Sequence, residues 1–92
     1  MKIKKEIFNI FNQWKAVNYS ISYIKKSGFP VENVKKLIYI FLKENNIENI
    51  NHNKIILVTN FVFSTKPNQK LRLQNNIFLI KKNKKVSVQK IS

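Results

Sequence analysis

The chain has almost no negative charge. It contains no Asp, and its four carboxylates are Glu6, Glu32, Glu44 and Glu48. No carboxylate follows Glu48, although nine Lys and Arg residues do, and the formal net charge over 92 residues is +14. Soluble domains normally mix both signs, because a surface of one sign repels itself. This excess predicts a polyanionic partner, and nucleic acid is the commonest polyanion.

Cysteine, glycine and long apolar runs are also scarce. The absence of Cys excludes disulfides and thiolate metal sites. Gly28 is the only glycine, which excludes a glycine-rich phosphate-binding loop. No apolar run approaches the roughly 20 residues that span a bilayer, and the N-terminus lacks the apolar region of a signal peptide.

Residues for catalysis are missing as well. General acid–base chemistry needs paired carboxylates or a His with a positioned partner. The four Glu are scattered, and His52 stands alone in an Asn-rich segment. No set of His and carboxylates has metal-ligand spacing. We therefore expect no enzyme, no cofactor, no metal and no small-molecule substrate.

The first half of the chain has helical periodicity. The composition is 43% hydrophobic and 12% aromatic, enough to build a core. Apolar residues recur every three or four positions over residues 3–26, which predicts one amphipathic helix. Gly28 then predicts the end of this helix, and Pro30 predicts the first turn of the next one. A second helix is expected over residues 31–43.

The second half has the pattern of strands and turns. Residues 49–53 predict a loop, and the β-branched and aromatic residues of 54–64 predict a strand. Alternation over 70–73 and the apolar run 77–80 predict two more, and residues 81–92 are either a last strand or an extended arm. We predict an α+β fold: two N-terminal helices, a small antiparallel sheet of three or four strands, and a basic C-terminal tail. The domain would comprise residues 1–80 and the basic extension residues 81–92.

Clusters of lysine are the candidate binding residues. Lysine side chains neutralise backbone phosphates and release counterions, and this binding does not depend on sequence. Because nearly all the cations are Lys and not Arg, bidentate recognition of bases is disfavoured. Of the aromatic residues, most have core spacing, and Tyr19 and Tyr23, with Asn18, are the best candidates for base contacts. The candidate RNA-binding residues are Lys25, Lys26, Lys35, Lys36, Lys66, Lys70, Arg72, Lys81, Lys82, Lys84 and Lys85.

Several segments share a pattern with one known module. They are residues 27–29 (Ser-Gly-Phe), 34–38 (Val-Lys-Lys-Leu-Ile), 50–54 (Ile-Asn-His-Asn-Lys) and 66–68 (Lys-Pro-Asn), followed by Leu71, Arg72 and Ile77. This arrangement resembles the S-four-type RNA-binding domain, in which two helices precede a short strand–turn, a Pro-containing turn and a further strand. The resemblance implies that RNA phosphates lie against the second helix and the adjoining loop, near Lys25, Lys26, Lys35 and Lys36.

These patterns lead to one expected function and two alternatives. We expect a structural RNA-binding protein, specifically a ribosomal protein whose partners are rRNA and neighbouring ribosomal proteins. The bias towards Lys, Asn, Ile and Phe indicates an AT-rich genome, so the expected location is the ribosome of a mitochondrion or of an AT-rich bacterium's cytoplasm. The first alternative is a free-standing regulator or viral DNA-binding protein. The second is a membrane-surface protein that binds through its basic first helix, which we disfavour because the β-rich half needs a helix to cover it.

Overall fold

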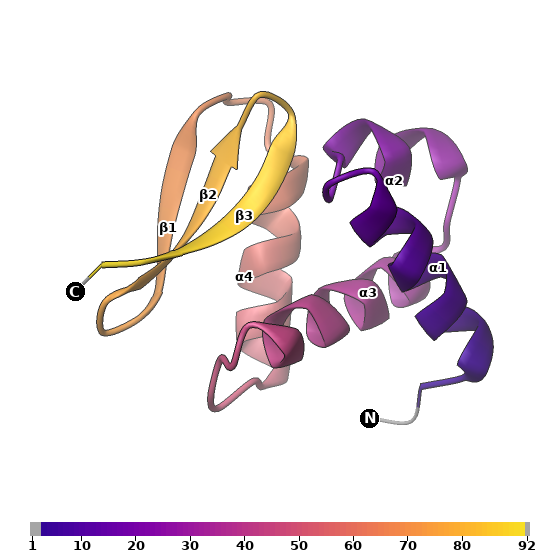
Figure 1. Ribbon diagram of the computed structural model, residues 1–92, viewed down its shortest axis with the longest axis horizontal. Helices are drawn as coiled ribbons and strands as arrows, with labels where there is room; N and C mark the ends of the chain where they lie inside the picture. The colour runs from indigo at the N-terminus through magenta and orange to yellow at the C-terminus, as the bar shows by residue number, and fades with distance from the viewer. Residues whose placement is uncertain (1–2, 92) are drawn as a thin grey trace.

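The computed structural model describes residues 3–91, which form four helices followed by a three-stranded antiparallel sheet (Figure 1). The predicted α+β class is confirmed, whereas the number and the bounds of the helices differ from the prediction. The elements are α1 (Lys5–Ala16), α2 (Ile21–Ser27), α3 (Val31–Glu44), α4 (His52–Phe63), β1 (Gln69–Gln74), β2 (Ile77–Lys82) and β3 (Lys85–Lys90).

The single helix expected over residues 3–26 is two helices. The break lies between Ala16 and Ile21, where Asn18 and Tyr19 have left-handed φ angles of 57° and 56°. Ser20 then caps α2, because its hydroxyl accepts a hydrogen bond from the backbone N–H of Tyr23 at 3.4 Å. The Trp14 indole donates to the Ser20 carbonyl at 3.0 Å, which ties the break to the core. The apolar period continues across the break, so it does not reveal the turn.

Residues 54–64, predicted as a strand, lie in helix α4 and its C-cap. The Asn51 side chain accepts a hydrogen bond from the Lys54 N–H at 2.8 Å and begins the helix. The buried residues Ile55, Val58 and Val62 have helical spacing. Burial of this face overrides the strand preference of β-branched side chains. Residues 50–54, a strand–turn in the S-four-type pattern, are therefore the cap and first turn of α4.

The three strands form an antiparallel meander in the order β1-β2-β3. Asn83 and Lys84 have φ angles of 54° and 60°, as a two-residue type I′ hairpin turn requires. The predicted C-terminal tail is thus the end of β2 and the whole of β3, and Val86 is buried. Residues 81–90 lie within the sheet and not in an extension.

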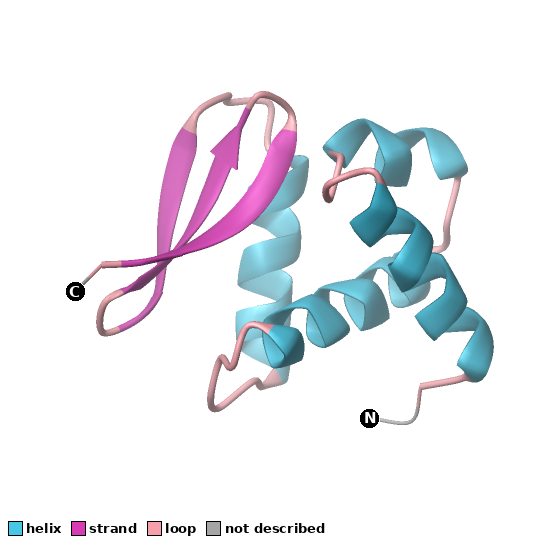
Figure 2. Cartoon of the chain, in the orientation of Figure 1, coloured by secondary structure: helices cyan, strands magenta, loops and turns pink. Residues whose placement is uncertain are grey.

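The helices pack together, and the sheet packs against them through one of its faces (Figure 2). Trp14 and Leu37 are fully buried and join α1 to α3. The sheet contributes Leu79 and Val86 to the same core. The radius of gyration is 12.4 Å, close to the value of about 12 Å for a folded domain of this length. The other face of the sheet carries no residue of this core.

Candidate nucleic-acid interface

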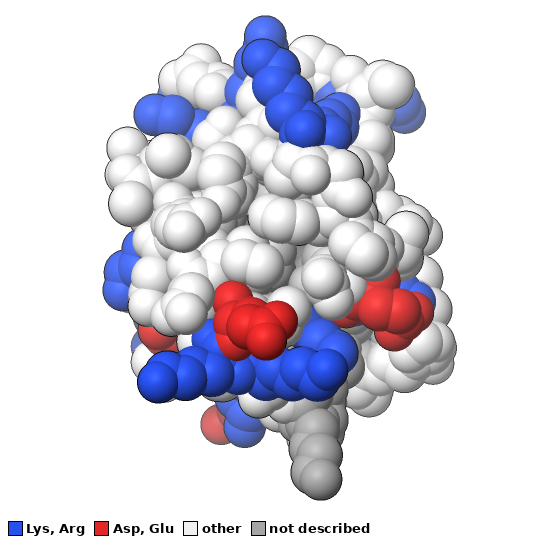
Figure 3. Space-filling view, turned by 90° about the vertical axis from the view of Figure 1, so that its right-hand side faces the viewer, with Lys and Arg blue, Asp and Glu red and all other residues white. Residues whose placement is uncertain are grey.

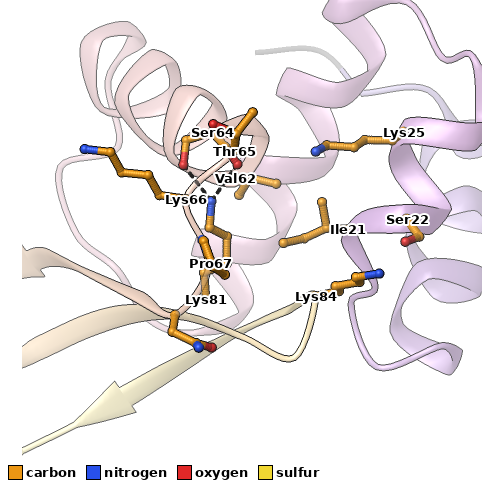
Figure 4. Close-up of a pocket in the computed structure, with 11 residues that line it drawn as sticks. Ile21, Ser22, Lys25, Val62, Ser64, Thr65, Lys66, Pro67, Lys81 and Lys84 are labelled. Atoms are coloured by element: carbon orange, nitrogen blue, oxygen red, sulfur yellow. Dashed lines mark hydrogen bonds between the residues drawn. The ribbon is translucent and has the colours of Figure 1, made fainter.

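A groove lies where α2, the segment after α4 and the β2–β3 hairpin meet (Figure 4). Its volume is about 320 Å³. Lys25 reaches from α2 towards the α4–β1 segment, and Lys84 extends from the hairpin towards α2. Lys66 lies on the α4–β1 segment, and its side chain points away from Lys25 and Lys84. Because the three lysines come from segments far apart in sequence, only the fold brings them together. The remaining lining residues are Ile21, Ser22, Val62, Ser64, Thr65, Pro67, Asn68 and Lys81.

Backbone hydrogen bonds hold the two walls of the groove in register. The Ile21 N–H donates to the Lys84 carbonyl at 2.9 Å, and the Val86 N–H donates to the Tyr19 carbonyl at 3.2 Å. The α1–α2 connection therefore pairs with the start of β3 as a short bridge between Ser20 and Lys85. Buried Ile21 anchors the first turn of α2 beside it. These contacts place Lys25 and Lys84 on one rigid unit.

Lys81 has a structural position that differs from its predicted role. Lys81 is 4% exposed. Its ammonium donates to the carbonyls of Phe61 and Ser64 at 2.9 Å and to the Ser64 hydroxyl at 2.7 Å, and Figure 4 shows the contacts with Ser64. The ammonium also lies 5.3 Å from the centroid of the Phe61 ring. A lysine ammonium has three N–H donors, so these contacts occupy all of them. Lys81 thus joins β2 to the C-terminal end of α4 and has no donor left for a phosphate.

The charge of Lys81 still contributes to the groove. Burial lowers the pKa of Lys81, and the nearby positive charge of Lys25 lowers it further. Burial removes the ammonium from water and Lys25 repels it as a like charge, so both effects disfavour the charged form of Lys81. An anion in the groove would reduce this repulsion.

No carboxylate lines the groove. The four Glu residues lie on α1, on α3 and in the segment that follows α3. Within residues 3–91, the ion pairs are Lys15–Glu44 and Lys35–Glu32, each at 3.7 Å. On the face that carries α1 and α2, carboxylates lie in the lower half, and every charged side chain visible in the upper half is Lys or Arg (Figure 3). Positive charge at the groove is therefore uncompensated.

The other predicted binding residues fall outside the groove. Lys26 is exposed on α2, and Lys35 and Lys36 are partly buried on α3, where Lys35 pairs with Glu32. Lys82 and Lys85 are direct cross-strand partners beside the hairpin turn, an arrangement that places like charges opposite each other. Lys70 and Arg72 are exposed on β1, on the sheet face turned away from the core.

Three polar residues of the groove were not predicted from the sequence. Ser22, Thr65 and Asn68 line it and bring hydroxyl and amide groups between the lysines. Their only sequence signal is proximity to Lys25 and Lys66. Tyr19, expected to contact bases, instead packs edge-on against Trp14 and Phe41, with ring centroids 5.0 and 4.8 Å away. Burial, and secondarily the charge of Glu44, raises the pKa of its phenol.

The polar side chains that line the groove are hydrogen-bond donors of the kind that can contact an anion. Lysine ammonium groups, hydroxyls and an amide donate hydrogen bonds to phosphate oxygens. His52 lies at the start of α4, outside the groove. In the part of the chain that the structure describes, no three His, Asp or Glu side chains form a metal-binding group, and no helix has the length and apolar character to cross a bilayer. No protein family, curated protein or solved structure with significant similarity to this chain was found.

Proposed function

We propose that this chain is a structural RNA-binding protein that holds the sugar-phosphate backbone of RNA in the groove between α2 and the β2–β3 hairpin. The observation that carries the proposal is the composition of the groove, which Lys25, Lys66 and Lys84 line together with polar side chains and without a carboxylate. A net charge of +14 supports the same partner. Contacts of this kind position RNA without specifying its bases.

A ribosomal role is the more specific part of the proposal. Within a ribosome, rRNA phosphates would neutralise lysines on several faces at once, which suits cations spread over α2, the hairpin and β1. The partners would then be rRNA and neighbouring ribosomal proteins, in a mitochondrion or an AT-rich bacterium. Mass spectrometry of sucrose-gradient fractions tests this point. If the protein is found only in the fractions without ribosomal particles, or if it binds one DNA duplex sequence in preference to others, a free-standing regulator is favoured instead.

The groove itself is tested by two variants with equal net charge. In the groove variant, Lys25, Lys66 and Lys84 are replaced by Gln. In the control variant, Lys5, Lys15 and Lys43 on α1 and α3 are replaced by Gln, close in sequence or space to Glu6 and Glu44. Binding to an RNA hairpin is measured over a range of salt concentrations.

The groove variant is expected to lose about 0.7–0.9 of log–log salt slope per phosphate contact removed, or about 2–3 in total. The control variant is expected to keep a slope close to that of the wild type. Equal losses in both variants would mean that net charge alone binds RNA and that the groove has no special role.

A further inference from the structure

The outer face of the sheet carries two apolar side chains that do not contribute to the core. Phe78 and Ile80 of β2 alternate with buried Leu79 and are only partly buried themselves. Neither belongs to the core cluster or to the side chains that pack against it. Phe78 and Ile80 therefore lie partly exposed on the outer face of the sheet, away from the core.

Positive and polar side chains surround these two residues. The strand register places Phe78 between Arg72 of β1 and Gln89 of β3. It places Ile80 between Lys70 and Ser87 in the next row, with the Lys82–Lys85 pair beyond them. Side chains opposite each other on neighbouring strands lie about 4.5–5.5 Å apart at Cβ. The outer face is therefore an aromatic ring set among cations.

One neighbouring cation already interacts with the ring. The Lys70 ammonium lies 5.9 Å from the centroid of the Phe78 ring. No carboxylate follows Glu48 in the sequence, so none of the strands brings a negative charge to this face. A partner that supplies both anions and flat rings would complement the whole face.

We propose that the outer face of the sheet binds unpaired nucleotides of RNA, with one base stacked on Phe78 and neighbouring phosphates held by Lys70 and Arg72. Unpaired bases expose π-faces that stack on aromatic side chains, whereas bases within a duplex do not. Gln89 and Ser87 supply hydrogen-bonding groups at the edge of the stacked base. This inference rests on the proposed function, but the outer face shares no residue with the groove.

The test compares two RNA probes on the full-length chain, a short oligouridylate and a blunt RNA duplex. Phe78→Leu removes the ring and keeps an apolar side chain, and Phe78→Tyr keeps the ring. Phe8→Leu is the matched control, because Phe8 is a 46% exposed aromatic residue on α1. Binding is measured by fluorescence anisotropy, and circular dichroism checks that each variant is folded.

Phe78→Leu is expected to weaken oligouridylate binding roughly 5- to 150-fold, the range associated with loss of one stacked base. Duplex binding is expected to stay unchanged, and Phe78→Tyr and Phe8→Leu are expected to bind both probes as the wild type does. Oligouridylate binding that is insensitive to Phe78→Leu overturns the inference. If oligouridylate binding is insensitive to Phe78→Leu but the substitution abolishes binding to a ribosomal protein, the outer face is a protein interface instead.

Failure of this inference is distinguishable from failure of the proposed function. A wild-type chain that binds the duplex through the groove but ignores oligouridylate disproves only the role of the outer face. A wild-type chain that binds neither RNA disproves both.

Discussion

The buried lysine of β2 allows a quantitative test of the fold. Replacing Lys81 by Met keeps an unbranched, largely apolar side chain and removes the ammonium that joins β2 to the end of α4. The Phe61 carbonyl still accepts a hydrogen bond from the Ser64 N–H at 3.4 Å, and the Ser64 hydroxyl still donates to Gln69 at 3.1 Å. Among the contacts of residues 3–91, the Ser64 carbonyl loses its only partner.

The expected cost follows from these contacts. A hydrogen bond to a charged group contributes about 1.5–3 kcal/mol, and an acceptor left without a partner costs about 1–3 kcal/mol when it is fully buried. Ser64 is half-buried, so the cost at its carbonyl lies at the lower end of that range. Because two of the three acceptors keep partners, we expect Lys81→Met to lower the free energy of unfolding by about 2–4 kcal/mol. Urea unfolding at neutral pH measures this difference.

The control is Lys84→Met in the hairpin turn, where the side chain is exposed. It is expected to change the free energy of unfolding by less than about 0.5 kcal/mol. If both substitutions have equal effects, Lys81 does not act as the link that its hydrogen bonds describe.

The same substitution has a pH dependence of known sign. The folded-state pKa of Lys81 is lowered, by burial first and by Lys25 second. It therefore lies below the unfolded value of about 10.4, and between the two values the unfolded chain binds more protons. The contribution of Lys81 to the free energy of unfolding consequently rises with pH between the folded-state and unfolded-state pKa values. The difference between wild type and Lys81→Met should widen as pH rises towards about 10, and a narrowing difference would contradict the assignment.

Two further predictions concern helix ends. Asn51→Ala removes the cap of α4 and should lower the free energy of unfolding by about 1 kcal/mol, whereas Asn51→Ser should retain most of the stability of the wild type. Urea unfolding of the three proteins measures the difference. Equal stability of the Ala and Ser variants would contradict the capping role. Gly28 has φ +70° and no atom within 4 Å of an added Cβ. Gly28→Ala should therefore cost about 1 kcal/mol through backbone strain alone, or about 4–8 °C in Tm by thermal melting; an unchanged Tm would show that the turn relaxes.

Some elements are predictable because their signals are local. Gly28 adopts the left-handed angle expected at the end of a helix, and α3 runs over Val31–Glu44 as its apolar period predicts. The alternation in β1 and the turns around it also identify strands correctly. In each case the pattern among neighbouring residues is enough to predict the element.

Other elements are not predictable from local patterns. Residues 54–64 have strand-like composition, but Ile55, Val58 and Val62 are buried together only on a helix packed against the rest of the core. The break at Asn18 and Tyr19 depends on Trp14 and on pairing with β3, about 65 residues later. The weak alternation of β3 likewise becomes a strand because β2 lies beside it.

The sequence by itself determines that this protein is strongly basic and has the local signals for α3 and for the β1–β2 hairpin. The tertiary structure decides which lysines lie close together in space. Lys81 and Lys82 are adjacent in sequence, yet the pleat of β2 buries one among carbonyls and turns the other to the exposed face. The groove requires contacts between α2, the end of α4 and the β2–β3 hairpin, and no local pattern encodes which distant segments will meet.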